Sequence, residues 1–357
     1  MPAAARFFAK IYNSDGSVFR RVLDSGILLS VPRIVREVNK PAGEITLDLS
    51  LPWDNFGYGT KINLFDLVKV YAVNLANPGG LLVYQGHITE IETRFDANGN
   101  AVSLRIFPID ALLGNAFWVG ASYTVTYAGA DVDTMFSDGV DDTNAVHGSF
   151  FSKNFGNPAL SVNVNFVQKT HLESLNAAFG FLDATWYWRV RANGQIDLQQ
   201  YSDVTATHTL VLGKHVDSIQ AGKSILNVKN LVRLGWGGGP TYNLYSNGGS
   251  QAAYGHRDSA ITDSGIQNLA GADARGNGEV AKLKDPKTKT LITVNANYAI
   301  ENILPGDTIK VLNVPSGASS LLSTQVLRIQ RVEFDGGLVV LHLADIVDVF
   351  GGELLSI

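Results

Sequence analysis

The side chains of this chain best suited to metal binding are five aspartates in one acidic stretch: Asp131, Asp133, Asp138, Asp141 and Asp142. A calcium-binding loop needs oxygen ligands at positions 1, 3 and 5, a glycine at position 6 and a glutamate at position 12. Counted from Asp131, position 5 is Met135 and position 12 is Asp142, so the pattern fails. The sequence therefore predicts no calcium loop here.

A second run of oxygen donors lies at residues 96–100. Asp96, Asn98 and Asn100 begin a calcium pattern better, but Ala101 replaces the glycine and Phe107 replaces the glutamate. Asp and Asn also favour turns, because their side chains hydrogen-bond to the nearby backbone. We interpret this run as a hairpin turn.

The remaining reactive residue types give no catalytic pattern. No two histidines are four residues apart, which excludes a His-Glu-x-x-His zinc motif; they are His87, His147, His171, His208, His215, His256 and His342. The chain has no cysteine, which excludes thiol catalysis and cysteine–zinc sites. No Gly-x-Ser-x-Gly elbow is present, and the glycine-rich residues 235–239 lack the Lys-Ser/Thr of a phosphate-binding loop. We predict no catalytic, cofactor-binding or metal-ligating residue, and no cofactor.

The clearest local structure is a helix over residues 171–182 followed by a hairpin over 186–198. Thr170 and Glu173 have the spacing of a capping box, in which both side chains bind backbone N–H groups at a helix start. The apolar residues that follow are three or four positions apart and form one helix face: Leu172, Leu175, Phe179 and Leu182. Asn193-Gly194 then supplies a turn between two alternating strands.

Trp186 and Trp188 are alternate residues on one face of the first strand of this hairpin. We expect them to pack against Leu175 and Phe179 of the preceding helix. The alternative is a platform for sugar rings, as in a hydrolase of cell-wall glycan. Such an enzyme needs a pair of carboxylates at a defined separation, and the sequence does not identify that pair.

Other segments give coarser expectations. Residues 44–51 alternate between apolar and polar, as in a half-buried strand. Residues 241–256 resemble an exposed excursion, and residues 259–284 are predicted to be helical. Gly276 and Gly278 each cost such a helix roughly 1 kcal/mol relative to alanine, so we expect a break between them.

The composition is that of a globular, turn-rich protein. Of 357 residues, 45% are hydrophobic and 17% are charged, and the 36 glycines exceed the usual ~7%. Many short strands joined by tight turns would account for the glycines. A net charge of −5 argues against a nucleic-acid-binding protein. No apolar stretch resembles a signal peptide or a membrane span, so we expect synthesis in a cytosol and no membrane insertion.

One β pattern occurs twice in the chain. Residues 65–73 (Phe-Asp-Leu-Val-Lys-Val-Tyr-Ala-Val) resemble residues 306–314 (Gly-Asp-Thr-Ile-Lys-Val-Leu-Asn-Val), and each copy leads into a hairpin with a Phe-Asp turn. The match is short, so chance resemblance of amphipathic strands is the alternative. Duplication predicts two related barrels with Asp66 and Asp307 at equivalent positions.

These patterns predict a mainly β fold with minor α structure, in which two related small β-barrels carry inserted helix-plus-hairpin domains. The predicted domains are a first β-barrel over residues 1–120 and an inserted α+β domain over 121–208. A second β-barrel over 209–357 would contain an inserted loop and helix segment at about 236–290.

The order of five motifs resembles the hub proteins of phage tails, which include baseplate hubs of contractile tails, tail-associated proteins of long flexible tails and hubs of contractile injection systems. The motifs are residues 83–91 (Val-Tyr-Gln-Gly-His-Ile-Thr-Glu-Ile), the hairpin 186–198, residues 227–234 (Asn-Val-Lys-Asn-Leu-Val-Arg-Leu), residues 254–257 (Tyr-Gly-His-Arg) and residues 304–311 (Leu-Pro-Gly-Asp-Thr-Ile-Lys-Val). Each motif is weak by itself, and the specificity lies in their order over nearly the whole chain.

The resemblance implies a structural hub at the distal end of a tail, in the virion, assembled in the host cytoplasm. A homotrimer would present six barrels to a hexameric tail tube, with an axial channel through which DNA passes without specific binding. The implied partners are tail tube and distal tail proteins, the tape-measure protein, and a spike, fibre or lytic protein. Relatives often carry a C-terminal hydrolase or fibre-binding extension, and this chain ends soon after its second barrel. We therefore expect no enzyme activity, the alternative being a cell-wall glycan hydrolase or a carbohydrate-binding tail component.

Overall fold

The computed structural model describes residues 6–24, 26–29, 32–50, 62–73, 78–96, 99–118, 123–183, 185–201, 205–237, 242–295, 298–314, 326–335 and 338–344. The strands are β1 (Arg6–Tyr12), β2 (Phe19–Leu23), β3 (Ile34–Glu37), β4 (Ile45–Leu49), β5 (Leu67–Val73), β6 (Leu81–Asp96), β7 (Gly99–Pro108), β8 (Thr124–Asp131), β9 (Ser152–Phe155), β10 (Ser161–Val167), β11 (Trp186–Val190), β12 (Gln195–Gln200), β13 (His208–Val211), β14 (Val216–Ser224), β15 (Leu231–Trp236), β16 (Tyr242–Ser246), β17 (Asp258–Asp263), β18 (Lys287–Val294), β19 (Thr308–Leu312), β20 (Leu327–Asp335) and β21 (Leu338–Ala344). The helices are α2 (Leu112–Asn115), α3 (Val132–His147), α4 (His171–Phe179), α5 (Gly248–Tyr254) and α6 (Leu269–Leu283), with 3-10 turns η1 (Ile109–Ala111) and η3 (Ile300–Asn302).

The first part of the chain folds into a six-stranded sheet in the order β2-β1-β5-β6-β7-β4. Its strands are antiparallel and alternate between buried and exposed residues; in β4, Ile45, Leu47 and Leu49 point into the core. That burial confirms the half-buried strand predicted at residues 44–51. Asp96 pairs with Gly99 across the β6–β7 connection, which confirms the predicted hairpin turn, although Asn98 lies outside the described residues.

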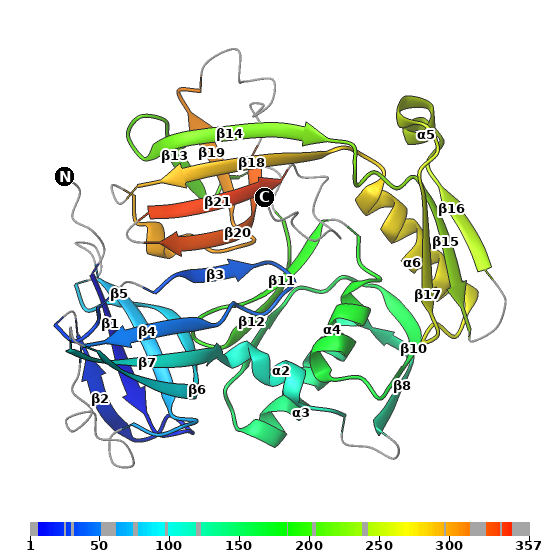
Figure 1. Cartoon of the computed structure of the whole chain (residues 1–357). Helices are drawn as coiled ribbons and strands as arrows, with labels where there is room; N and C mark the ends of the chain where they lie inside the picture. Colours follow the sequence, from blue (N-terminus) through cyan, green and yellow to red (C-terminus); the bar gives the residue numbers. More distant parts are fainter. Residues whose placement is uncertain are drawn as a thin grey trace.

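The last part of the chain forms a second sheet in the order β13-β19-β20-β21-β18-β14. The four strands β19-β20-β21-β18 repeat the order and antiparallel pairing of β5-β6-β7-β4 in the first sheet. Strand β3, from the first part of the chain, pairs with β20 and joins the second sheet (Figure 1). Each sheet is curled into half of a barrel, and the predicted mainly β fold is confirmed.

Both sheets bury their apolar faces in one hydrophobic cluster. The cluster contains Leu47 and Ile88 from the first sheet and Ile292 and Ile329 from the second, all fully buried. A separate cluster lies among α3, α4, β11 and β12, with β15 and α6 packed against it. The described residues therefore form two cores, and the two sheets share one of them.

The predicted helix-plus-hairpin unit is present as α4, β11 and β12. Thr170 caps the helix, because its hydroxyl accepts from the N–H of Glu173 while the Glu173 carboxylate accepts from the N–H of Thr170. The helix ends at Phe179, earlier than predicted. No helix within the described residues is long and apolar enough to span a membrane.

The helix predicted over residues 259–284 is wrong in two respects. Residues 258–263 form strand β17, which pairs with β15 in a three-stranded sheet. The exposed excursion expected at residues 241–256 contains β16 and α5, most of whose residues are exposed or half-buried. The helix that does form, α6, runs without a break past Gly276 and Gly278. A Cβ at Gly276 would lie 2.1 Å from the Tyr245 ring, so the glycine allows the helix to approach β16 closely.

Candidate functional site

The acidic stretch considered for calcium lies on a helix and not in a loop. Asp131 is the N-cap of α3, and the other four aspartates follow within the helix. Each of three carboxylates has its own partner: Asp138 accepts from the Tyr127 hydroxyl at 3.1 Å, Asp141 from Lys153 Nζ at 2.6 Å, and Asp142 Oδ2 lies 2.9 Å from His171 Nε2. Within the described ranges, no three His, Asp or Glu side chains are placed to hold a metal ion.

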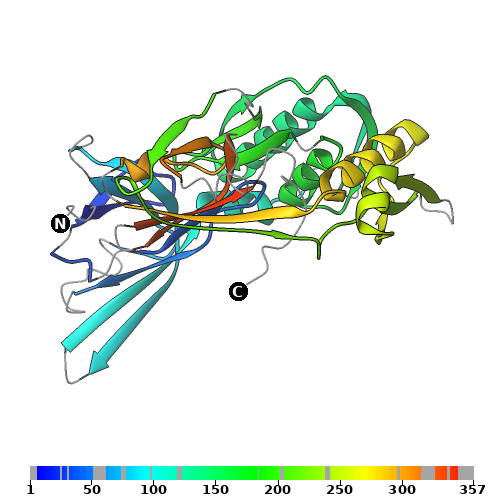
Figure 2. The same ribbon diagram turned by 90° about the horizontal axis from the view of Figure 1, so that it is seen from above.

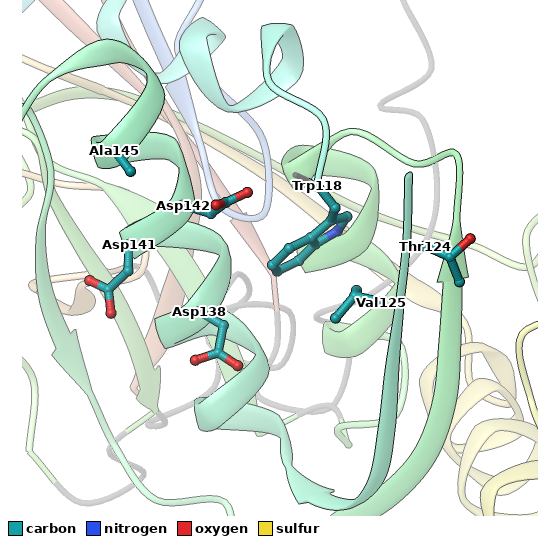
Figure 3. Close-up of a pocket in the computed structure, with 7 residues that line it drawn as sticks. All are labelled: Trp118, Thr124, Val125, Asp138, Asp141, Asp142 and Ala145. Carbon is teal, nitrogen blue, oxygen red and sulfur yellow. The ribbon is translucent and has the colours of Figure 1, made fainter. Parts of the chain in front are cut away.

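A pocket of about 420 Å³ lies beside this helix (Figure 3). Its lining consists of three carboxylates and an alanine of α3, the side of a tryptophan and two residues of β8: Asp138, Asp141, Asp142, Ala145, Trp118, Thr124 and Val125. The three carboxylates give the pocket a negative potential that would attract a cation. All three carboxylates already bind side chains of neighbouring elements, namely Tyr127 of β8, Lys153 of β9 and His171 of α4. These contacts hold α3 against the three elements.

His171, Asp142 and Thr143 superficially resemble a catalytic triad. His171 and Thr143 are completely buried, and Nδ1 of His171 lies 2.6 Å from the Thr143 hydroxyl oxygen. Burial lowers the pKa of His171, so the ring is neutral at pH 7. A substrate cannot reach the hydroxyl, and the three residues join α3 to α4.

The tryptophan pair belongs to the core. Trp188 is fully buried 6.5 Å from the Phe136 ring, and Trp186 is half-buried. Trp188 belongs to the cluster that contains Leu175 and Phe179, and Trp186 packs against that cluster. Packing was the expected role, and a fully buried Trp188 cannot form a sugar platform.

The two aspartate turns are the main structural feature that the sequence predicted. Asp66 Oδ2 accepts from the N–H of Asn63 at 2.8 Å, and Asp307 Oδ2 accepts from the N–H of Leu304 at 3.0 Å. Each carboxylate therefore binds the backbone three residues earlier in the chain. The prediction that Asp66 and Asp307 occupy equivalent positions is confirmed.

The backbone contacts of the two turns agree as well. The carbonyl of Asp66 accepts from the N–H of Ile88 at 3.0 Å, and the carbonyl of Asp307 accepts from the N–H of Ile329 at 2.9 Å. The preceding residue donates its N–H to the carbonyl of the same isoleucine at 2.7 Å in both turns. That preceding residue has a positive φ, 67° at Phe65 and 90° at Gly306. A shared set of contacts at a constant interval of 241 residues shows that the two turns are structurally equivalent, as duplication predicts.

The two turns differ in their ionic surroundings. Among the described residues, Asp66 forms an ion pair with the partly exposed Arg20, at 3.3 Å, and burial raises the pKa of Asp66. Asp307 lies 2.8 Å from Arg189 and 2.9 Å from His208. Burial acts to raise the pKa of Asp307, but the hydrogen bond from His208 and the charge of Arg189 outweigh it and lower the pKa.

Arg189 makes this second turn a junction with the inserted hairpin. The guanidinium is 6% exposed and donates to Asp307, to the carbonyl of Pro305 and, at 2.7 Å, to Asp197. Asp197 is fully buried and also accepts from Arg191 at 2.8 Å. The hairpin β11–β12 is therefore tied to the second sheet by a buried network that sequence spacing could not reveal.

A second ionic cluster lies where β3 meets β20. Glu333 accepts from Arg33 at 2.5 Å, and its other oxygen lies 2.7 Å from Arg331 and 2.8 Å from His342. Arg33 and Glu333 are 300 residues apart in the chain. The ion pair between Arg33 and Glu333 therefore helps to hold the first part of the chain against the second sheet.

Sequence comparison found no family model that matches and no curated protein that matches. Structural comparison found similar folds along nearly the whole chain. A tail protein from Neisseria meningitidis MC58 has a TM-score of 0.66 at 13% identity, with 98% of this chain and 100% of that chain covered. The 43 kDa tail protein of prophage MuSo2 from Shewanella oneidensis also has a TM-score of 0.66 at 13% identity, with 97% and 100% covered.

A third similar structure is prophage tail protein gp18 from Listeria monocytogenes EGD-e, with a TM-score of 0.59, 10% identity and 95% and 94% coverage. At such identities the likeness concerns the fold, and it extends over both sheets and the regions inserted between them. The chain has the fold of phage tail proteins, as the order of its sequence motifs predicted.

Proposed function

We propose that this chain is a structural hub at the distal end of a phage tail or a tail-like particle. The observation that carries the proposal is the presence of two equivalent β units in one chain. Three copies would supply six such units, enough to match a sixfold tail tube. The fold shared with tail proteins over 95% or more of the chain supports this role.

In this role, three chains close a ring of repeated head-to-tail contacts, a common way to build a closed oligomer. The ring would leave an axial channel, join the tail tube and distal tail proteins on one side, and meet a spike, fibre or lytic protein on the other. The tape-measure protein and then the DNA would pass through it. The net charge of −5 suits a conduit, because a basic wall would retain DNA by releasing counterions from its phosphates.

Two measurements test the proposal. Mass photometry of the purified chain should give a particle of about 115 kDa, three times the chain mass of 38.4 kDa, and addition of the tube protein should give a larger particle that contains this trimer. A reconstruction of the particle that contains it should place the chain on the tail axis. A location on a peripheral fibre, or a monomer that persists in the presence of the tube protein, would contradict the hub.

The hydrolase and carbohydrate-binding alternatives have less support, because they relied on an exposed aromatic pair, whereas Trp188 is buried in the core and Trp186 is half-buried against it. A peptidoglycan zymogram should show no clearing, and a glycan array should not retain the chain. Clearing in the zymogram would favour the hydrolase, and retention on the array would favour the carbohydrate-binding role.

A further inference from the structure

One edge of strand β6 in the first sheet is equivalent to the edge of strand β20 that β3 covers in the second sheet. The correspondence begins at Ile88 and Ile329, which bind the equivalent aspartate turns. The register of each hairpin shifts directly afterwards, between Ile88 and Glu90 in one and between Ile329 and Arg331 in the other. The same bulge at the same place aligns residues 90–93 of β6 with residues 331–334 of β20.

In the second sheet, strand β3 covers this edge. Residues 34–37 pair antiparallel with residues 331–334, and the N–H of Val38 donates to the carbonyl of Gln330 at 2.9 Å. Backbone groups alternate in direction along a strand, so Val332 and Phe334 also direct theirs toward β3. With β3 in place, Glu333 is 9% exposed and its carboxylate binds Arg33.

In the first sheet, no described strand pairs with residues 90–93 on that edge. Glu90, Glu92 and Thr93 are exposed. Glu92 has the position of Glu333, but none of the described contacts gives it a cation like Arg33. Figure 2 shows the outer half of this hairpin extending from the body of the molecule. A two-stranded ribbon has little stability by itself and presents free N–H and C=O groups to any strand that can pair with them.

We propose that a strand from a second copy of this chain pairs with β6 at residues 90–93, in the position that β3 has on β20, and brings a basic side chain to Glu92. The inference rests on the proposed trimeric hub. Each chain would contribute two units to the ring, the first built on the sheet that contains β6 and the second on the sheet that contains β20. In a ring where these units alternate, β3 makes the contact from a first unit to the second unit of the same chain. The contact from that second unit to the next chain then falls on the equivalent edge, which is the open edge of β6. Strand addition of this kind gains affinity from main-chain hydrogen bonds.

The sharpest test replaces Thr93 by proline. Thr93 corresponds to Phe334, so its N–H points to the open edge and takes no part in the β6–β7 ladder. Proline is tolerated where a strand N–H faces solvent, so Thr93→Pro should fold normally while blocking strand addition. Glu92→Arg tests the charge contact separately, because a basic partner would then be repelled.

The control is Asp258→Arg, a charge reversal at an exposed residue of another edge strand, β17; it also breaks an ion pair with the exposed Arg233, a contact that contributes little to stability. Near-ultraviolet circular dichroism and thermal melting should show that all three variants fold like the wild type. Analytical ultracentrifugation over a concentration series then measures assembly. We expect the wild type and Asp258→Arg to form trimers. Thr93→Pro and Glu92→Arg should still sediment as monomers at concentrations at least tenfold higher than the concentration at which the wild type forms trimers.

The outcomes separate this contact from the proposed function. If all four proteins form trimers equally well, the edge contact is wrong and the trimeric hub stands. If the wild type stays monomeric even in the presence of the tube protein, the trimer is contradicted and the edge contact with it. A photo-crosslinking residue at position 93 should link two copies of this chain in the assembled particle; links only to a different protein would overturn the inference.

Discussion

Arg189 neutralises buried negative charge, so its loss should destabilise the folded protein. It is the cation between two buried carboxylates, Asp197 from β12 and Asp307 from the second aspartate turn. Removing one partner from a buried ion pair leaves uncompensated charge, which typically costs 3–5 kcal/mol. We expect Arg189→Met to lower the free energy of unfolding by about that amount in urea titrations.

The control for this prediction is Arg191→Met. Arg191 binds the same Asp197, but its side chain is 36% exposed, and after its loss the Asp197 carboxylate still has the buried Arg189 as a partner at 2.7 Å. The loss should be clearly smaller than for Arg189→Met. Equal losses in the two variants would show that the buried network does not act as a unit.

Asp110 should make the stability depend on pH in the direction opposite to most carboxylates. It is 3% exposed, accepts from the N–H of Ala42 at 2.7 Å, and burial raises its pKa from 3.8 to about 6. Between those pH values the folded chain binds more protons than the unfolded chain. Its contribution to stability is therefore fully present below pH 3.8 and is lost as the pH rises through about 6.

Replacing Asp110 by asparagine removes this titration and keeps an acceptor for the N–H of Ala42. A shift of about two pKa units corresponds to roughly 3 kcal/mol. The free energy of unfolding of Asp110→Asn, taken relative to the wild type, should therefore rise by about that amount between pH 4 and pH 7. Urea titrations across this range measure it, and a pH-independent difference would contradict the assigned pKa.

Among the elements, the sequence predicted those whose patterns are local. The alternation in β4, the capping box at Thr170 and the paired aspartate turns each depend on residues close together in the chain, and all three were found. Helix α3 was missed because its Asp, Ser, Thr and Asn residues have low helix propensity. Its buried residues nevertheless keep helical spacing, and that periodicity was the available signal: Val132, Met135, Phe136, Gly139, Val140 and Thr143.

Elements and contacts that depend on distant partners were not predictable. The unbroken α6 needs the close approach of Tyr245 to Gly276, and the place of β3 needs β20, nearly 300 residues away. The Arg189 network likewise joins residues that lie far apart in the sequence. Local propensity is a weak guide in such cases, because tertiary packing overrides it.

Gly306 gives a test at the level of the turn. Its φ is 90°, and a Cβ would lie 2.3 Å from the Tyr187 ring. Gly306→Ala should therefore lose about 2 kcal/mol or more, from backbone strain and displacement of Tyr187. Gly213 has a similar φ of 83° with nothing within 4 Å, so Gly213→Ala isolates the backbone strain. Thermal melts of both variants should show the larger loss at Gly306; equal losses would exclude a role for Tyr187.

At the scale of the whole molecule, the shared core predicts that the two sheets unfold together. Ile88 of the first sheet and Ile329 of the second belong to one buried cluster, although 241 residues separate them. Native-state hydrogen exchange should give β6 and β20 the same opening free energy as denaturant is added. Substitution of Leu47 in the first sheet by alanine should lower the protection of β20 as much as that of β6. Separate opening energies for the two strands would mean that each sheet is an independent unit.

The pairing of β3 with β20 also sets a problem of timing during synthesis. A ribosome adds about 5–20 residues per second, so the interval of 300 residues between Arg33 and Glu333 takes roughly 15–60 s. Throughout that time β3 has emerged but β20 does not yet exist. Contacts of such long range slow folding, and an unpaired strand on a nascent chain can pair wrongly with its neighbours. The yield of folded protein in cells should therefore depend on chaperones that shield β3 until β20 is made.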